Sequence, residues 1–234
     1  MIQIIFNKIS NNDLDIKVVK KPFIPPPKKV VGVIEVEGKD GNYYIDKETY
    51  EDITISIEFN FFSDNNDDLE LKSAKIQNWL NDIEDNKLII DNSMFYFKVK
   101  NIEMSNIEYD GVYEINKFTV DFVCEAYKYL RNDYKQIVDS FYSVFNNMYA
   151  IAKPIYYIVG NGTLNVNGNV VTITNNTDRI VIDTTIGKVL NNNNIVVAGK
   201  TNINAMSDLY LKKGINNITY SGIQLQIKAN YRTL

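Results

Sequence analysis

Residues 38–61 constrain the fold of this chain more than any other segment. A polar turn around Gly41 is followed by a stretch in which apolar and polar residues alternate strictly. The apolar positions are Ile53, Ile55, Ile57, Phe59 and Phe61. Because successive side chains of a β-strand point to opposite faces, this period of two predicts a strand with one face on a core and the other in water.

Composition narrows the classes of protein to which the chain can belong. Its 234 residues suffice for one large domain or two small ones, and 45% hydrophobic residues are enough to build cores. The net charge of -4 disfavours a nucleic-acid partner, because phosphates require a basic surface. The densest basic stretch is residues 17–29, which Pro22 and three further prolines interrupt. We interpret it as an extended surface segment, with a site for an anionic partner as the alternative.

We expect neither an export signal nor a membrane partner. The first fifteen residues contain one short apolar run and no cleavage-site pattern. No apolar stretch approaches the roughly 20 residues that cross a bilayer. We therefore expect synthesis in a cytoplasm.

The period of the pattern changes once in the first half of the chain. Four apolar residues recur at helical spacing, with Trp79 beside them: Leu69, Ile76, Leu80 and Ile83. Asp67 followed by Glu70 predicts a capped helix start. Strand patterns flank this segment, so we predict an antiparallel sheet covered by one amphipathic helix. The predicted strands are residues 2–6, 16–19, 30–36, the strand that ends at Phe61, and residues 87–90, 94–102 and 114–124.

The second half of the chain has a different pattern. Residues 126–152 are rich in aromatic side chains without helix or strand periodicity, which favours a connection between two domains. From Pro154 onward, short strand patterns follow one another at intervals of about 8–12 residues, with turn residues between them. The predicted strands are residues 155–159, 163–166, 170–174, 179–183, 195–197, 209–211, 217–220 and 224–229.

These patterns predict a mainly β protein with two domains. Residues 1–130 are expected to form a β-rich N-terminal domain with one α-helix. Residues 131–152 are expected to form the connection, and residues 153–234 a C-terminal β-sandwich.

We find no residues in a pattern that indicates catalysis, a cofactor or a metal. The chain has no histidine and one cysteine, which excludes histidine-dependent triads and thiolate zinc clusters. Cys124 is in phase with the apolar face of its strand, so we interpret it as a core residue. Residues 64–68 match the start of a calcium loop, but Leu69 replaces the required glycine and Lys75 the required glutamate.

Two further function classes stay open at this stage. A carbohydrate-binding adhesin could stack sugar rings on tyrosines of the C-terminal domain, although burial is the simpler interpretation of these residues. The candidates are Tyr156, Tyr157, Tyr210 and Tyr220. A glycosidase would need a pair of carboxylates, and none stands out among 29 acidic residues.

Strand and turn motifs occur in a characteristic order along most of the chain. The first half contains GKDGNYY, YEDITISIEF, a helix ending in NWLND, KLIIDN before MFYFKV, and INKFTVDFVCEAYKY. The second half contains KPIYYIVGNGTLNVNGNVVTI, RIVIDTTIGKV and LKKGINNITYSG. In this order and spacing, the motifs resemble those of the distal tail proteins of long-tailed bacteriophages.

The resemblance implies a structural protein rather than an enzyme. In that family the N-terminal domain is a β-rich belt with one helix that closes into a hexameric ring, and the C-terminal domain is a galectin-like β-sandwich. The resemblance thus implies a homo-hexamer at the virion tail tip, made in the cytoplasm of the bacterial host. The implied partners are the tail-tube protein, the tail-associated tip protein and a receptor-binding protein. A hub of a contractile tail or a tail-derived bacteriocin would fit the same pattern.

For the contacts of such a ring, we predict two segments that precede the compact core, residues 2–6 and 30–36. Rings close through head-to-tail interfaces, and exposed strand edges can pair between copies. The predicted interface residues are Ile2, Ile4, Phe6, Val31 and Val33. Polar substitution of Ile4 or Phe6 is expected to leave a folded monomer.

Overall fold

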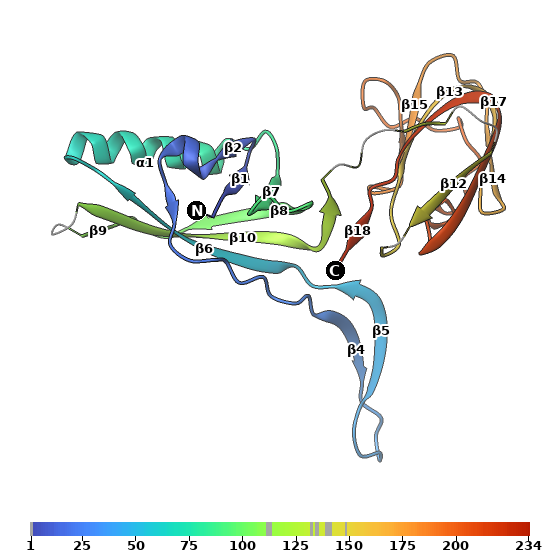
Figure 1. Cartoon of the computed structure of the whole chain (residues 1–234). Helices are drawn as coiled ribbons and strands as arrows, with labels where there is room; N and C mark the ends of the chain where they lie inside the picture. Colours follow the sequence, from blue (N-terminus) through green and yellow to red (C-terminus); the bar gives the residue numbers. More distant parts are fainter. Residues whose placement is uncertain (1, 111–113, 132, 134–135, 139–141, 148) are drawn as a thin grey trace. The chain divides into compact units, whose positions relative to one another are not determined.

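The computed structural model describes residues 2–110, 114–131, 133, 136–138, 142–147 and 149–234. The chain divides into two compact units, Met1–Lys128 and Tyr129–Thr233, and each is described by itself. Both consist mainly of β-strands, and α1 (Asn66–Asn81) is the one α-helix within the described ranges (Figure 1). The predicted mainly β fold class is therefore confirmed.

The first unit is built on a sheet with the strand order β2-β1-β7-β8-β10-β6-β3, and β9 also pairs with β10. The strands are β1 (Ile4–Phe6), β2 (Ile9–Ser10), β3 (Lys17–Val18), β6 (Ile53–Phe62), β7 (Lys87–Ile90), β8 (Phe95–Met104), β9 (Glu108–Asp110) and β10 (Ile115–Leu130). A short 3-10 helix, η1 (Asn11–Leu14), follows β2. Strands β4 (Lys29–Ile34) and β5 (Tyr43–Tyr50) form a separate two-stranded sheet.

The central pair of this sheet is β6 with β10, which run antiparallel with Phe59 opposite Phe118. The rings of these two residues stack with their centroids 5.3 Å apart. All five apolar residues of the alternating stretch are buried in the core, and the polar residues between them are exposed or half-buried. The predicted period-two strand is confirmed, and Cys124 is buried in the same core.

Helix α1 covers one face of the sheet, but it begins earlier than the capping pattern predicts. The N-cap is Asn65, whose side-chain oxygen accepts a hydrogen bond from the Asp68 amide at 2.9 Å. The prediction of Asp67 as N-cap was therefore wrong by two residues. Asn65 has the extended backbone of a cap. Asp67 and Asp68 then lie in the first turn, where negative carboxylates interact favourably with the helix dipole.

The second unit is a sheet with the strand order β11-β17-β13-β15-β16, with β12 also on β17 and β14 also on β13. The strands of this sheet are β11 (Gln136–Val138), β12 (Tyr142–Asn147), β13 (Ile155–Val166), β14 (Asn169–Ile173), β15 (Ile180–Asp183), β16 (Lys188–Leu190) and β17 (Gly214–Lys228). The short strand β18 (Arg232–Thr233) pairs with β10 instead. Figure 1 shows β13 and β17 as long, curved strands. They curl around a separate core that includes Tyr156, Leu164 and Ile227.

The described parts of residues 131–152 belong to the second unit and are not a separate connection between two domains. They include β11 and β12, and both strands pair with β17 in the second unit. The prediction failed because these strands are short and their partner lies far along the chain. Local periodicity gives no sign of such a pairing.

In the second unit, two glycines that were predicted to end a strand lie inside one. The predicted turn at residues 160–162 lies inside the continuous strand β13. The two strands predicted at residues 217–220 and 224–229 are parts of the single strand β17. The pairing of β13 with β17 shifts register between Gly160 and Thr163. A Cβ atom on Gly162 would lie 1.9 Å from the Ser221 carbonyl oxygen. The glycine here permits a close backbone approach at a bulge rather than a chain reversal.

Two predicted strands are absent from the second unit. Residues 195–197 form only an isolated bridge, between Val196 and Leu190. Residues 209–211 overlap the 3-10 helix η2 (Met206–Leu209) and keep a single bridge, from Leu211 to Ala152.

Candidate assembly interface

The β4–β5 hairpin brings many exposed apolar side chains together in the first unit. Its large hydrophobic residues are between 44% and 70% exposed. They are Val31, Val33, Ile34, Val36, Tyr43, Tyr44 and Ile45. Contiguous exposed apolar surface of this kind marks interaction sites in soluble proteins.

The register of the hairpin places apolar residues on both of its faces. Val33 lies opposite Tyr44, and the next residue, Ile34, lies opposite Tyr43. Residues directly opposite each other in an antiparallel pair share a face, and neighbours along a strand point to opposite faces. An isolated two-stranded hairpin is only marginally stable in water. The hairpin therefore has the properties of an element that another protein surface covers on both sides.

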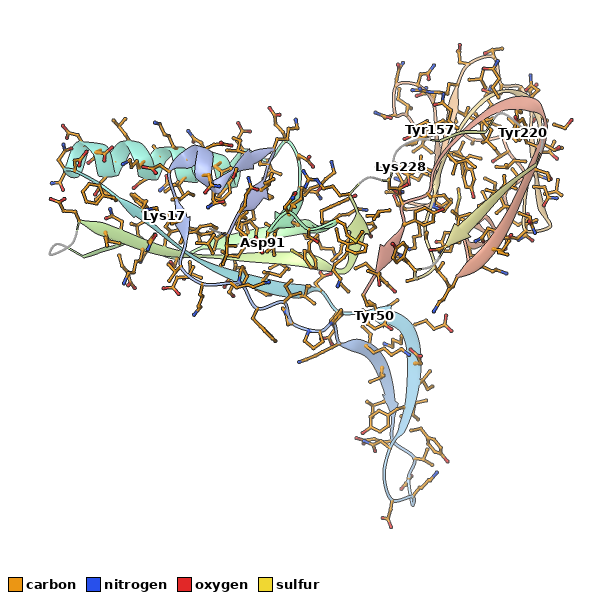
Figure 2. All side chains as sticks on the ribbon, viewed as in Figure 1. Lys17, Tyr50, Asp91, Tyr157, Tyr220 and Lys228 are labelled. Atoms are coloured by element: carbon orange, nitrogen blue, oxygen red, sulfur yellow. The ribbon has the colours of Figure 1, made fainter. Side chains whose placement is uncertain are left out.

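The base of the hairpin is held on the sheet of the same unit. The Tyr50 ring meets Tyr127 of β10 edge-to-face, with 5.8 Å between the ring centroids. The Lys100 ammonium of β8 binds the Asp52 carboxylate at 2.8 Å. Figure 2 marks Tyr50 at this junction. The attachment fixes one end of the hairpin and leaves the apolar end uncovered.

An ion pair joins the two strands near the base. The Lys29 ammonium contacts the Asp46 carboxylate, and this contact lowers the pKa of Asp46 and raises the pKa of Lys29. Both groups are exposed, so the pair contributes little to stability but supports the register.

The five predicted interface residues differ in their exposure. Ile4 and Phe6 have 0% exposure, and β1 is paired on both edges, by β2 and by β7. The prediction that these two side chains contact a neighbour is therefore contradicted, because the core of their own unit encloses them. Ile2 is half-buried against that core. Val31 and Val33 are exposed on β4 and stay a prediction.

The other strand of the hairpin was not predicted to be part of the interface. Tyr43, Tyr44 and Ile45 directly follow the Asp-Gly-Asn turn, and we assigned no interface role to them. The available signal was an apolar run on each side of a polar, glycine-containing turn, which is typical of a hairpin.

The four tyrosines that were candidates for sugar stacking are buried or half-buried, and Tyr220 packs against the core of the second unit. Tyr156 is buried, its hydroxyl donates to the Leu209 carbonyl at 2.6 Å, and burial raises its pKa. The Arg179 guanidinium lies over the Tyr157 ring at 5.7 Å from the centroid. Lys153 lies 5.5 Å from the centroid of the Tyr210 ring.

The remaining motifs are accounted for by local structure. Burial, followed by the charges of Asp52 and Glu125, raises the pKa of the Cys124 thiol to about 12. The carboxylate of Asp68 binds Lys72 at 3.0 Å and accepts from the Asp64 amide, and both contacts lower its pKa. Within the described ranges, no helix is long and apolar enough to cross a membrane.

Comparison with known proteins identifies the first unit. Residues 6–124 match the phage tail protein RIFT-related domain, and this match includes the sheet, α1 and the hairpin. The chain belongs to this phage tail protein family. None of the curated proteins compared with it matches its sequence.

Two solved structures of phage proteins share the fold over the whole chain. One is the Dit protein (gp 19.1) of phage SPP1, described as a paradigm of the hub adsorption apparatus in phages that infect Gram-positive bacteria. The likeness has a TM-score of 0.62 at 13% identity and covers 97% of each chain. The other is the baseplate of phage P2 in its activated conformation with calcium, with a TM-score of 0.52 at 9% identity over 100% of this chain and 98% of that one. At such identities the likeness shows the fold, which extends beyond the family match into the second unit.

Proposed function

We propose that this phage tail protein is a structural hub, in which six copies close into a ring that joins the tail tube to the tail tip. The observation on which the proposal depends is the β4–β5 hairpin with exposed apolar residues on both faces. Membership of a phage tail family supports it. So does the fold shared with a protein described as a hub.

The geometry of the hairpin favours a head-to-tail contact. A patch on one copy that binds a different patch on the next copy generates a ring when the rotation closes. The hairpin is attached to the sheet at its base, and its two apolar faces are exposed. A different surface, on another copy, would have to bury them. We propose that each hairpin inserts against the neighbouring copy, with Val31, Val33 and Tyr44 on one face of the contact and Ile34, Tyr43 and Ile45 on the other.

The proposed partners outside the ring are the tail-tube protein on one side, and the tail-associated tip protein and a receptor-binding protein on the other. We propose no catalytic role, and the virion tail tip as the location after synthesis in the bacterial host. The adhesin alternative loses support because one of its four tyrosines is buried and two others lie beneath cationic side chains.

The experiment that tests the proposal is the mass of the purified chain. Light scattering after size exclusion should give about six times the 26.9 kDa chain mass, and negative-stain images of the same peak should show rings. Val33→Asp combined with Tyr44→Asp should yield a folded monomer, since two charges would enter the apolar contact. Val170→Asp and Ile195→Asp are matched controls on exposed apolar positions of the second unit.

One outcome would count against the hub, and another against the hairpin as its ring contact. One is a wild-type chain that stays monomeric at every concentration up to the solubility limit. The other is a Val33 and Tyr44 double variant that still forms six-copy rings, because the hairpin could then not be the ring contact.

A further inference from the structure

The charges of the first unit are segregated along the chain. Residues 16–34 contain five lysines and no acidic residue. The rest of residues 1–128 contains 24 acidic residues against ten lysines and no arginine. One unit therefore has a basic segment on an otherwise strongly acidic body.

The middle of the basic segment is a fixed, extended strap, which we define as residues 19–28 between β3 and β4. At its start the Val19 amide donates to the Glu58 carbonyl at 2.9 Å, and at its end the Glu51 amide donates to the Lys28 carbonyl at 2.9 Å. Pro22 is buried, and three consecutive prolines restrict the backbone before Lys28. The strap runs beside β6 between these two anchors (Figure 1).

The strap holds an aromatic ring in solvent. Phe23 is 76% exposed, the highest value among the large hydrophobic residues in the described part of the chain. Val19 and Ile24 are also exposed. Because the backbone on both sides is already constrained, little conformational entropy remains to be lost when this ring is buried. Phenylalanine is one of the aromatic residues that are enriched in protein–protein interfaces.

The lysines of the strap differ in their ion pairs and exposure. Lys20 is paired with Glu58 of the same chain at 3.5 Å. Lys21 and Lys28 are exposed on the strap. Their charges are thus available to orient a partner with acidic groups, mainly by steering the encounter.

We propose that the strap binds the acidic first unit of a second copy of this chain, with Phe23 as the anchor and Lys21 and Lys28 as the charges that orient it. The inference rests on the proposed ring and names a second element of its interface. A second copy is favoured because the chain itself has the complementary charge, and a head-to-tail contact joins two different patches of the same chain. The strap also continues directly into β4 of the hairpin. A nucleic acid is disfavoured, because the acidic body around the strap would repel its phosphates.

Substitutions on the strap test the inference in the full-length chain. Phe23→Ala should raise the concentration at which rings dissociate at least tenfold. Lys21→Glu with Lys28→Glu should also raise the concentration at which rings dissociate at least tenfold. Added salt should weaken wild-type rings, because it screens the attraction, and should strengthen the rings of this variant, because it screens the repulsion. Leu71→Ala on the exposed side of α1, and Lys188→Glu with Lys213→Glu in the second unit, are matched controls that should leave dissociation unchanged. Mass photometry across a dilution series measures all variants, and circular dichroism verifies the fold.

Photo-crosslinking identifies the occupant directly. Benzoylphenylalanine in place of Phe23, in an equal mixture of nitrogen-14 and nitrogen-15 chains, should give crosslinked peptides that join a light strap to a heavy first unit. If Phe23→Ala leaves the dissociation of the rings unchanged and the crosslinked rings give no such mixed peptides, this inference is overturned while the hub stands. A wild-type chain that never assembles would overturn both. Mixed peptides that join the strap to the second unit would also overturn the assignment.

Discussion

Val33 of β4 lies directly opposite Tyr44 of β5, and both side chains are exposed on the same face of the hairpin. The pair suits a β-sheet, because a β-branched residue directly opposite an aromatic residue is a stabilising cross-strand pair. Within its own unit it gains no burial. The energetic value of the pair must then come from a contact with another surface, which is the basis of the first prediction.

Tyr44→Ala should separate assembly from stability. In the monomer the ring is exposed, so its removal should change the free energy of unfolding by no more than about 0.5 kcal/mol. In the ring it should raise the dissociation concentration markedly, because truncated aromatic hot spots cost about 2 kcal/mol or more. Urea unfolding at low concentration and light scattering at high concentration measure the two effects. Equal losses in both would argue that Tyr44 supports the fold instead.

Phe6→Ala should unfold or strongly destabilise the first unit rather than produce a folded monomer. The ring is fully buried, meets Trp79 and Phe122 edge-to-face, and the Phe6 carbonyl accepts the Trp79 indole N–H at 2.9 Å. Removing it should cost about 3–5 kcal/mol. Ile9→Ala on the adjacent β2 is the control, because Ile9 is exposed. The fluorescence of Trp79 in a urea titration reports the loss, and an unshifted midpoint would contradict the assigned burial.

Gly162→Ala should destabilise the second unit by more than about 2 kcal/mol, since its Cβ would meet the backbone of Ser221. The obstacle is a carbonyl in a paired strand, which a side-chain rotation cannot relieve. Gly32→Ala in the hairpin is the matched control, because the added Cβ there would have only ordinary contacts. Thermal unfolding compares the two variants. Similar midpoints would remove the case for a tight bulge between β13 and β17.

Cys124 should resist thiol reagents in the native state and react once urea opens the first unit. Burial raises the pKa of its thiol from 9.0 to about 12, so the reactive thiolate is suppressed at pH 8. The folded state holds the proton more tightly, so this contribution to stability is present below pH 9 and is lost as pH rises towards 12. Labelling with a chromogenic disulfide measures the reactivity, and rapid labelling of the folded chain would contradict the prediction.

Features that depend on local periodicity could be predicted from the sequence. Alternation over residues 53–61 predicted a strand and its buried face, and the helical spacing of Ile76 and Leu80 predicted α1. Both depend on the geometry of a single element, which a short window of sequence contains. The mainly β fold and the core position of Cys124 followed from the same patterns.

Which apolar residues are buried, and which stay exposed for a partner, depends on the tertiary structure. Ile4 and Val33 are both aliphatic residues in short strands, yet the first lies between two paired strands under α1 and the second lies on a hairpin without cover. Likewise, β12 exists because β17 offers it an edge from far along the chain. Burial and pairing are relations between distant segments, and their free energy is gained only when the chain brings those segments together.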